Sequence, residues 1–135
     1  KWHRTGPYIR QHDPDFRADG KITVFDNNTD GAGGQVFGGS RILELDPVSG
    51  DVAVLYGAEF DQEMYTRVRG KSQNLSNGNL LIIEALAGRV FEVTAEGTVV
   101  WEFINRFDQD EVARISDATR YPPGYFSVED WSCGG

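Results

Sequence analysis

Residues 78–103 read GNLLIIEALAGRVFEVTAEGTVVWEF, which contains three short segments rich in β-branched and aromatic side chains. Polar turns that include glycine separate the segments, as is typical of antiparallel β-strands. In the middle segment, Val90 and Val93 flank the charged Glu92, so apolar and polar positions partly alternate. We therefore expect three consecutive strands in this stretch.

The same pattern occurs earlier in the chain. Residues 20–56 read GKITVFDNNTDGAGGQVFGGSRILELDPVSGDVAVLY, and Arg41 of this copy aligns with Arg89 of the later one. The first copy is longer in one place, a loop from Asp26 to Gly39. Internal repetition with the insertion confined to a loop indicates a repeat fold.

A fourth strand can be placed upstream of each copy, near residues 8–13 and 66–75. Four antiparallel strands that recur about every 40–50 residues are typical of a β-propeller blade, whereas a sandwich would not repeat its internal pattern. The predicted fold is therefore all-β, a partial propeller of two four-stranded antiparallel blades with an irregular C-terminal tail. We place the partial propeller at residues 1–126, with blade one at about 8–56, blade two at about 66–103, a closing segment at 104–126 and a tail at 127–135.

Two details complete the structural prediction. Val112 and Ile115 are spaced among charges in a way that predicts a weakly helical stretch from Asp108 to Ala118. Trp101 follows two valines in a predicted strand, so we expect it in the core.

The single cysteine, Cys133, excludes an internal disulfide, and in a terminal tail it is either a reduced bystander or a functional thiol.

Composition excludes several classes of function. The 135 residues are 39% hydrophobic and 25% charged, which is globular composition, and the net charge is -8. An acidic surface repels phosphate backbones, so we expect no nucleic-acid partner. We also expect no membrane partner, because no apolar run approaches the ~20 residues that a spanning helix needs. Lys1 is not a start methionine and no signal-peptide core follows it, so we interpret the chain as processed or as a fragment.

His12 and Arg41 are the candidate catalytic residues. His12 lies just before the first strand of the first copy, where propeller strands line a central channel, and a histidine there can carry a proton, attack as a nucleophile or bind a ligand. The alternative is that it caps a turn or bonds neighbouring backbone. Arg41 opens a strand after Gly38-Gly39-Ser40, which suits bidentate binding of sulfate or phosphate. The alternative is a surface arginine paired with an aspartate, and Arg89 at the equivalent position favours a shared structural role.

Asp26, Asn28 and Asp30 match the first half of a calcium-binding loop, D-x-[DN]-x-[DN]-G. The twelfth position, where such a loop needs a bidentate glutamate, is Phe37. The segment is either a calcium site or a solvated loop rich in Asx residues. No other cofactor is expected, since two histidines and one terminal cysteine cannot form a zinc cluster.

The ordered set of motifs resembles the arylsulfate sulfotransferase family. The resemblance rests on His12-Asp13-Pro14-Asp15-Phe16, Ile22-Thr23-Val24-Phe25-Asp26-Asn27, Ser40-Arg41-Ile42-Leu43-Glu44-Leu45-Asp46, Leu75-Ser76-Asn77-Gly78-Asn79-Leu80-Leu81-Ile82, Gly88-Arg89-Val90-Phe91-Glu92-Val93 and Arg120-Tyr121-Pro122-Pro123-Gly124-Tyr125-Phe126. It covers roughly residues 8–126.

The resemblance implies a six-bladed propeller, of which this chain holds the C-terminal third, in a periplasmic or secreted protein. It also implies sulfuryl transfer from an aryl sulfate to a phenol through a sulfated histidine, with no nucleotide donor. His12 and Arg41 match family positions, and the resemblance implies that both line one channel, with Arg41 clamping sulfate oxygens and His12 donating to the ester oxygen. The second blade contains no histidine, so the nucleophile is not placed there.

Three functions follow from the sequence. The chain is a partial arylsulfate sulfotransferase-like module, a non-catalytic ligand- or protein-binding propeller module, or an aryl sulfate:phenol sulfotransferase assembled by oligomerisation. Two blades leave open sheet edges, so we expect a homo-oligomer. An aryl sulfate or another small anion is the expected ligand.

Overall fold

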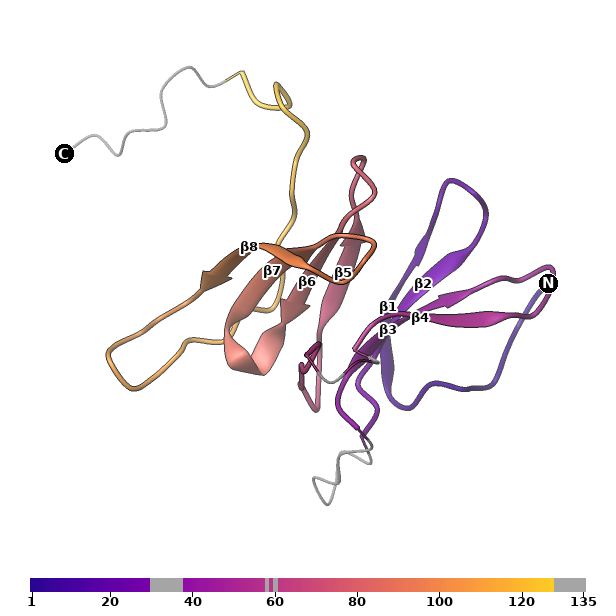
Figure 1. Cartoon of the computed structure of the whole chain (residues 1–135), viewed down its shortest axis with the longest axis horizontal. Coiled ribbons are helices and arrows are strands. Elements are labelled where there is room, and N and C mark those ends of the chain that lie inside the picture. Colours follow the sequence, from indigo (N-terminus) through magenta and orange to yellow (C-terminus); the bar gives the residue numbers. More distant parts are fainter. Residues whose placement is uncertain (30–37, 58, 60, 128–135) are drawn as a thin grey trace.

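The computed structural model describes residues 1–29, 38–57, 59 and 61–127, and within them it contains two four-stranded antiparallel sheets (Figure 1). The first sheet has the order β1-β2-β3-β4, and the second has the order β5-β6-β7-β8. The strands are β1 (Gln11–Phe16), β2 (Ile22–Asp26), β3 (Arg41–Leu45), β4 (Val52–Tyr56), β5 (Lys71–Asn74), β6 (Leu80–Glu84), β7 (Arg89–Val93) and β8 (Val99–Ile104). A 3-10 turn, η1 (Ala85–Ala87), links β6 to β7. The expected all-β class and the two four-stranded sheets are confirmed.

The two sheets use the same register at equivalent places. Asp26 at the end of β2 lies opposite Arg41 at the start of β3, and Glu84 of β6 lies opposite Arg89 of β7. The turns before β4 and β8 are also equivalent, with Gly50 at φ 82° and Gly97 at φ 83°. Only glycine adopts this left-handed conformation at no steric cost, which explains why both copies place it there.

One apolar core joins the two sheets. Its largest fully buried side chain from the first sheet is Phe25, and from the second it is Phe91, which lies 5.5 Å from the Tyr56 ring, centroid to centroid. The buried members of this core are Phe25, Ile42, Tyr56, Met64, Leu80, Ile82, Phe91 and Val93. Gly70 permits the close approach of β5, because a Cβ at this position would lie 2.5 Å from the Phe25 ring.

The terminal segments cover the outer faces of both sheets. On the first sheet, Tyr8 packs against Ile22, Val24 and Leu45. On the second, a smaller core of Leu81, Ile83 and Val90 is covered by Ile115, Ala118 and Leu75.

The predicted weak helix between Asp108 and Ala118 is wrong, because this stretch is irregular. Its backbone donors bond elsewhere: the Ala113 N–H donates to the Asn105 carbonyl (2.8 Å) and the Ile115 N–H donates to Ala85 (3.2 Å). The Asp108 carboxylate accepts the N–H groups of Asp110 and Glu111, which closes a turn in place of a helix.

The expected core position of Trp101 is also wrong, since this side chain is 50% exposed. It lies on β8, the last strand of its sheet, where no further described strand covers it. In the described part of the chain, no helix is long and apolar enough to span a membrane. The predicted tail lies outside the described residues except for residue 127, and Cys133 lies outside them too.

Candidate functional site

His12 lies on β1, the first strand of the first sheet, and its side chain is exposed. It stands opposite Phe25 in the ladder, so it faces the side of the sheet that meets the second sheet. Its Nε2 atom accepts a hydrogen bond from the backbone N–H of Arg69, at 3.2 Å. Arg69 is in the connection that leads into β5, so this bond joins β1 to the connection between the two sheets.

The connection that holds Arg69 is fixed by a buried amide. The Asn27 side chain is fully buried, and its Nδ2 donates to the carbonyls of Thr66 (2.6 Å) and Arg69 (2.8 Å). The Ser40 hydroxyl donates to the carbonyl of Thr66 (3.2 Å) and accepts its N–H (3.1 Å). These bonds explain how Arg69 keeps a left-handed φ of 63°, which is uncommon for a residue with a Cβ.

Further charged groups lie where β1 and β5 approach each other. The Asp13 carboxylate accepts the N–H of Ser72 (3.1 Å) and lies 3.8 Å from the Lys71 ammonium. Lys71 also pairs with Asp117 at 3.0 Å, and this hydrogen bond is the main cause that raises the pKa of Lys71. We call His12, Asp13, Arg69 and Lys71 the inner-strand cluster.

A small pocket of about 230 Å³ borders this cluster. Its polar lining residues are Asp13, Asp15, Lys71, Ser72, Gln73 and Thr119. Within the described part of the chain, the buried Ser72 hydroxyl has no hydrogen-bond partner. The pocket therefore combines a cation, two carboxylates and a hydroxyl that is able to bond a polar ligand.

Arg41 pairs with an aspartate, which is the second of the two interpretations that the sequence left open. Its Nε donates to the fully buried carboxylate of Asp26 at 2.9 Å, and its Nη2 donates to the Pro7 carbonyl at 3.0 Å. The other Asp26 oxygen accepts the N–H groups of Ile9 (2.7 Å) and Asn28 (3.1 Å). A buried carboxylate needs such partners, so Arg41 compensates for the burial of Asp26.

Arg89 has the equivalent partners in the second sheet. It bonds Glu84 (3.4 Å) and Glu102 (2.6 Å), and its guanidinium carbon lies 4.0 Å from the centroid of the Phe91 ring. Both arginines therefore pair with the acid that ends the preceding strand.

The structure does not bring His12 and Arg41 together. His12 shares a ladder row with Phe25, and Arg41 shares the next row with Asp26. Adjacent rows point to opposite faces of a sheet. The two side chains accordingly bond to different neighbours, the connection before β5 for His12 and the N-terminal segment for Arg41.

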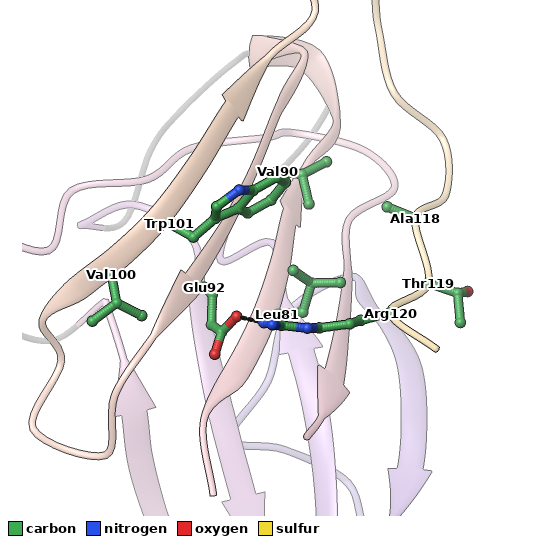
Figure 2. Close-up of a pocket in the computed structure, with 8 residues that line it drawn as sticks. All are labelled: Leu81, Val90, Glu92, Val100, Trp101, Ala118, Thr119 and Arg120. Carbon is green, nitrogen blue, oxygen red and sulfur yellow. Dashed lines mark ion pairs between the residues drawn. The ribbon is translucent and has the colours of Figure 1, made fainter. Parts of the chain in front are cut away.

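A second candidate surface is a groove of about 580 Å³ on the face of the second sheet that is turned away from the first. It is lined by Leu81, Val90, Glu92, Val100, Trp101, Ala118, Thr119 and Arg120. Figure 2 shows Arg120 reaching from the closing segment to an ion pair with Glu92, with Trp101 on the β8 side. Glu92 is only 3% exposed and also accepts the side-chain amides of Asn77 (3.0 Å) and Asn79 (2.7 Å).

Comparison with known proteins places this geometry in a family. A sequence model described as arylsulfotransferase (ASST) matches residues 1–106. The chain belongs to the arylsulfotransferase family. The suspected family resemblance is thereby confirmed, whereas a search of curated proteins finds no match.

The arylsulfotransferase match spans both sheets and the whole inner-strand cluster. It ends before Ser116, Asp117 and Arg120, the closing-segment residues that bond Arg69, Lys71 and Glu92. The family pattern therefore covers the cluster but not the segment that packs beside it.

The calcium prediction concerns Asp26, Asn28 and Asp30, of which Asp30 lies outside the described residues. Both Asp26 oxygens already accept hydrogen bonds from Arg41, Ile9 and Asn28. Among the residues described, no three His, Cys, Asp or Glu side chains are grouped to hold a metal ion. In this structure, the Asp26 carboxylate therefore stabilises the first sheet through these hydrogen bonds.

Sequence reasoning did not identify Arg69, Lys71 or Asn27. Arg69 and Lys71 could have been found from the strand predicted at residues 66–75. That prediction places both residues at the first strand of the second sheet, next to β1. The role of Asn27 had no such signal, because its partners lie 39 and 42 residues away in sequence.

Proposed function

We propose that the chain forms two neighbouring blades of an arylsulfotransferase-type β-propeller and takes part in sulfuryl transfer from an aryl sulfate to a phenol. The observation that carries this proposal is the family match over residues 1–106. The packing agrees with it. Phe25 and Ile42 of the first sheet pack on the second sheet, and the equivalent Ile83 and Val90 point to the far side of the second sheet. A radial repeat requires this arrangement, because each blade presents the same face to the next one.

In this proposal, His12 is the residue that meets the substrate. It is exposed on β1, and Lys71 places a positive charge beside the same strand. A sulfate ester carries negative charge on its oxygens, which a nearby cation and a hydrogen-bond donor stabilise as the ester bond breaks. Arg41 has no substrate role here, because it already pairs with buried Asp26 on the opposite face.

The test is sulfuryl transfer from a chromogenic aryl sulfate to phenol. We expect activity in the native chain, a loss of tenfold or more in His12→Ala, and no change in His3→Ala. His3 is a suitable control because it is exposed near the N-terminus. Absence of activity in the native chain under all conditions would contradict a catalytic role for this chain alone.

We further propose that copies of the chain associate. The exposed apolar side chains of β8 support this, since Val100 is 54%, Trp101 is 50% and Phe103 is 49% exposed. Exposed apolar side chains gathered on an edge strand are typical of interaction sites. Light scattering over a range of concentrations tests the proposal, and a monomeric mass throughout would contradict it.

A non-catalytic binding module is the second candidate, and the groove beside Trp101 favours it. A volume of about 580 Å³ lies in the range of small-molecule sites, and apolar walls beside the ion pair of Arg120 and Glu92 suit an amphipathic ligand. Calorimetric titration with an aryl sulfate checks this candidate. Binding that is lost in Trp101→Ala and kept in His12→Ala would favour it over the catalytic proposal.

A further inference from the structure

The bond between His12 and Arg69 constrains where the imidazole carries its proton. A backbone N–H can only donate, so the His12 Nε2 that faces it at 3.2 Å must present a lone pair. In a neutral imidazole, the other nitrogen then holds the proton. We propose that the connection before β5 fixes His12 as the Nδ1–H tautomer, which makes Arg69 a positioning residue.

The connection before β5 is held firmly enough to fix the tautomer of His12. Arg69 has a φ of 63° and Gly70 a φ of 98°, and the backbone of Gly70 lies against the Phe25 ring. A left-handed φ is uncommon for a residue with a Cβ, so it persists only where the surroundings hold it. Here the buried Asn27 amide holds the carbonyls on both sides of the turn, at Thr66 and Arg69.

The tautomer decides the chemistry that His12 can perform. Nucleophilic attack and proton abstraction by Nε2 both need the lone pair that the Arg69 N–H occupies. The Nδ1–H group remains as a hydrogen-bond donor. If the proposed function is correct, on which this step rests, His12 stabilises a sulfate or phenolic oxygen by donating from Nδ1, and it is not the group that becomes sulfated.

Nitrogen-15 NMR of the imidazole tests the tautomer without any substrate. Long-range ¹H–¹⁵N correlation of the full chain at about pH 8, above the ordinary histidine pKa of about 6.5, distinguishes a protonated nitrogen from one with a lone pair. We expect the Nδ1–H pattern for His12. His3, for which the described residues supply no hydrogen bond, is an internal control in the same spectrum.

Two variants separate the backbone of Arg69 from its side chain. Arg69→Gly removes the guanidinium that bonds Ser116 but keeps the N–H and tolerates the positive φ, so the Nδ1–H pattern should persist. Asn27→Ala frees the turn, so His12 should shift to a mixture of tautomers while the remaining spectrum stays folded. An Nε2–H pattern for His12 in the native chain would overturn the inference. Because this result needs no turnover, it is independent of whether sulfuryl transfer occurs.

Discussion

The acid and arginine pairs at the ends of β2 and β6 show how one residue pattern serves two sheets. Arg41 meets Asp26 and Arg89 meets Glu84 in the same cross-strand position, although the acids differ by a methylene group. The sequence left two interpretations of Arg41 open, anion binding and pairing with an aspartate. The repeat favoured the second, and the 2.9 Å contact with a fully buried carboxylate agrees with it.

The Lys71 ammonium group lies beside two carboxylates, those of Asp117 and Asp13. Its pKa is raised, first by the hydrogen bond to Asp117 and further by the charge of Asp13. A raised lysine pKa contributes stability that is present below the ordinary value of about 10.4 and is lost as the pH rises through the folded-state pKa. Asp117→Asn should therefore lower the pKa of Lys71 toward its ordinary value and weaken the stability gained below it.

NMR titration of the lysine side chains measures this shift. Lys21 is the matched control, because its pKa is raised by Glu44 of the first sheet and should not respond to Asp117→Asn. An unchanged Lys71 titration would show that the Asp117 contact does not form in solution.

Among the elements, the closing segment packs on the outer face of the second sheet. The Gln73 side chain bonds the backbone of Arg120 twice, through its amide (3.0 Å) and its oxygen (2.8 Å), in a pattern that resembles strand pairing. Ile115 and Ala118 cover the apolar face next to it. The segment thus covers the half of this face near β5 and leaves the β8 half exposed.

Arg120→Ala should loosen this segment. Arg120 is about half exposed, but it is the cation that neutralises Glu92, whose side chain is 4% exposed. We expect a loss of about 1–2 kcal/mol in the free energy of unfolding, less than for a fully buried pair, because solvent screens the exposed guanidinium.

Chemical denaturation measures the loss, and faster amide exchange at Ile115 would locate it, since that N–H bonds Ala85. Arg114→Ala is the control from the same segment, because the described residues give this exposed side chain no ion pair. Equal stability of both variants would mean that the Glu92 pair contributes nothing.

The strands were predictable from sequence and the closing segment was not, for a physical reason. Six strands, β2 to β4 and β6 to β8, are marked by β-branched and aromatic composition and by the repeat. The polar strands β1 and β5 lack this composition and were placed only upstream of each copy, near residues 8–13 and 66–75. The backbone donors of Ala113 and Ile115 instead bond residues outside their own stretch, so local spacing misassigned them to a helix. Trp101 and Asn27 were missed for the same reason, because burial and long-range bonding depend on which strands become neighbours.

In the whole molecule, one core is shared by the two sheets, so we expect them to unfold as one unit. Phe25 and Ile42 of the first sheet pack in the same cluster as Ile82 and Phe91 of the second. The bonds from β5 to β1 add to this, since Ser72 donates to Asp13 across the two sheets. Each sheet therefore needs the other in order to bury the face that carries these core residues.

Ile82→Val tests this coupling. Removal of one buried methylene group should cost about 0.5–1.5 kcal/mol, and the chain should still fold. If the sheets unfold together, amide exchange governed by global unfolding should accelerate equally in β2 of the first sheet and in β7 of the second. Val48→Ala is the control, because Val48 is 94% exposed between β3 and β4 and its truncation should leave exchange in both strands unchanged. Faster exchange in β7 with unchanged exchange in β2 would show that the two sheets unfold as independent units.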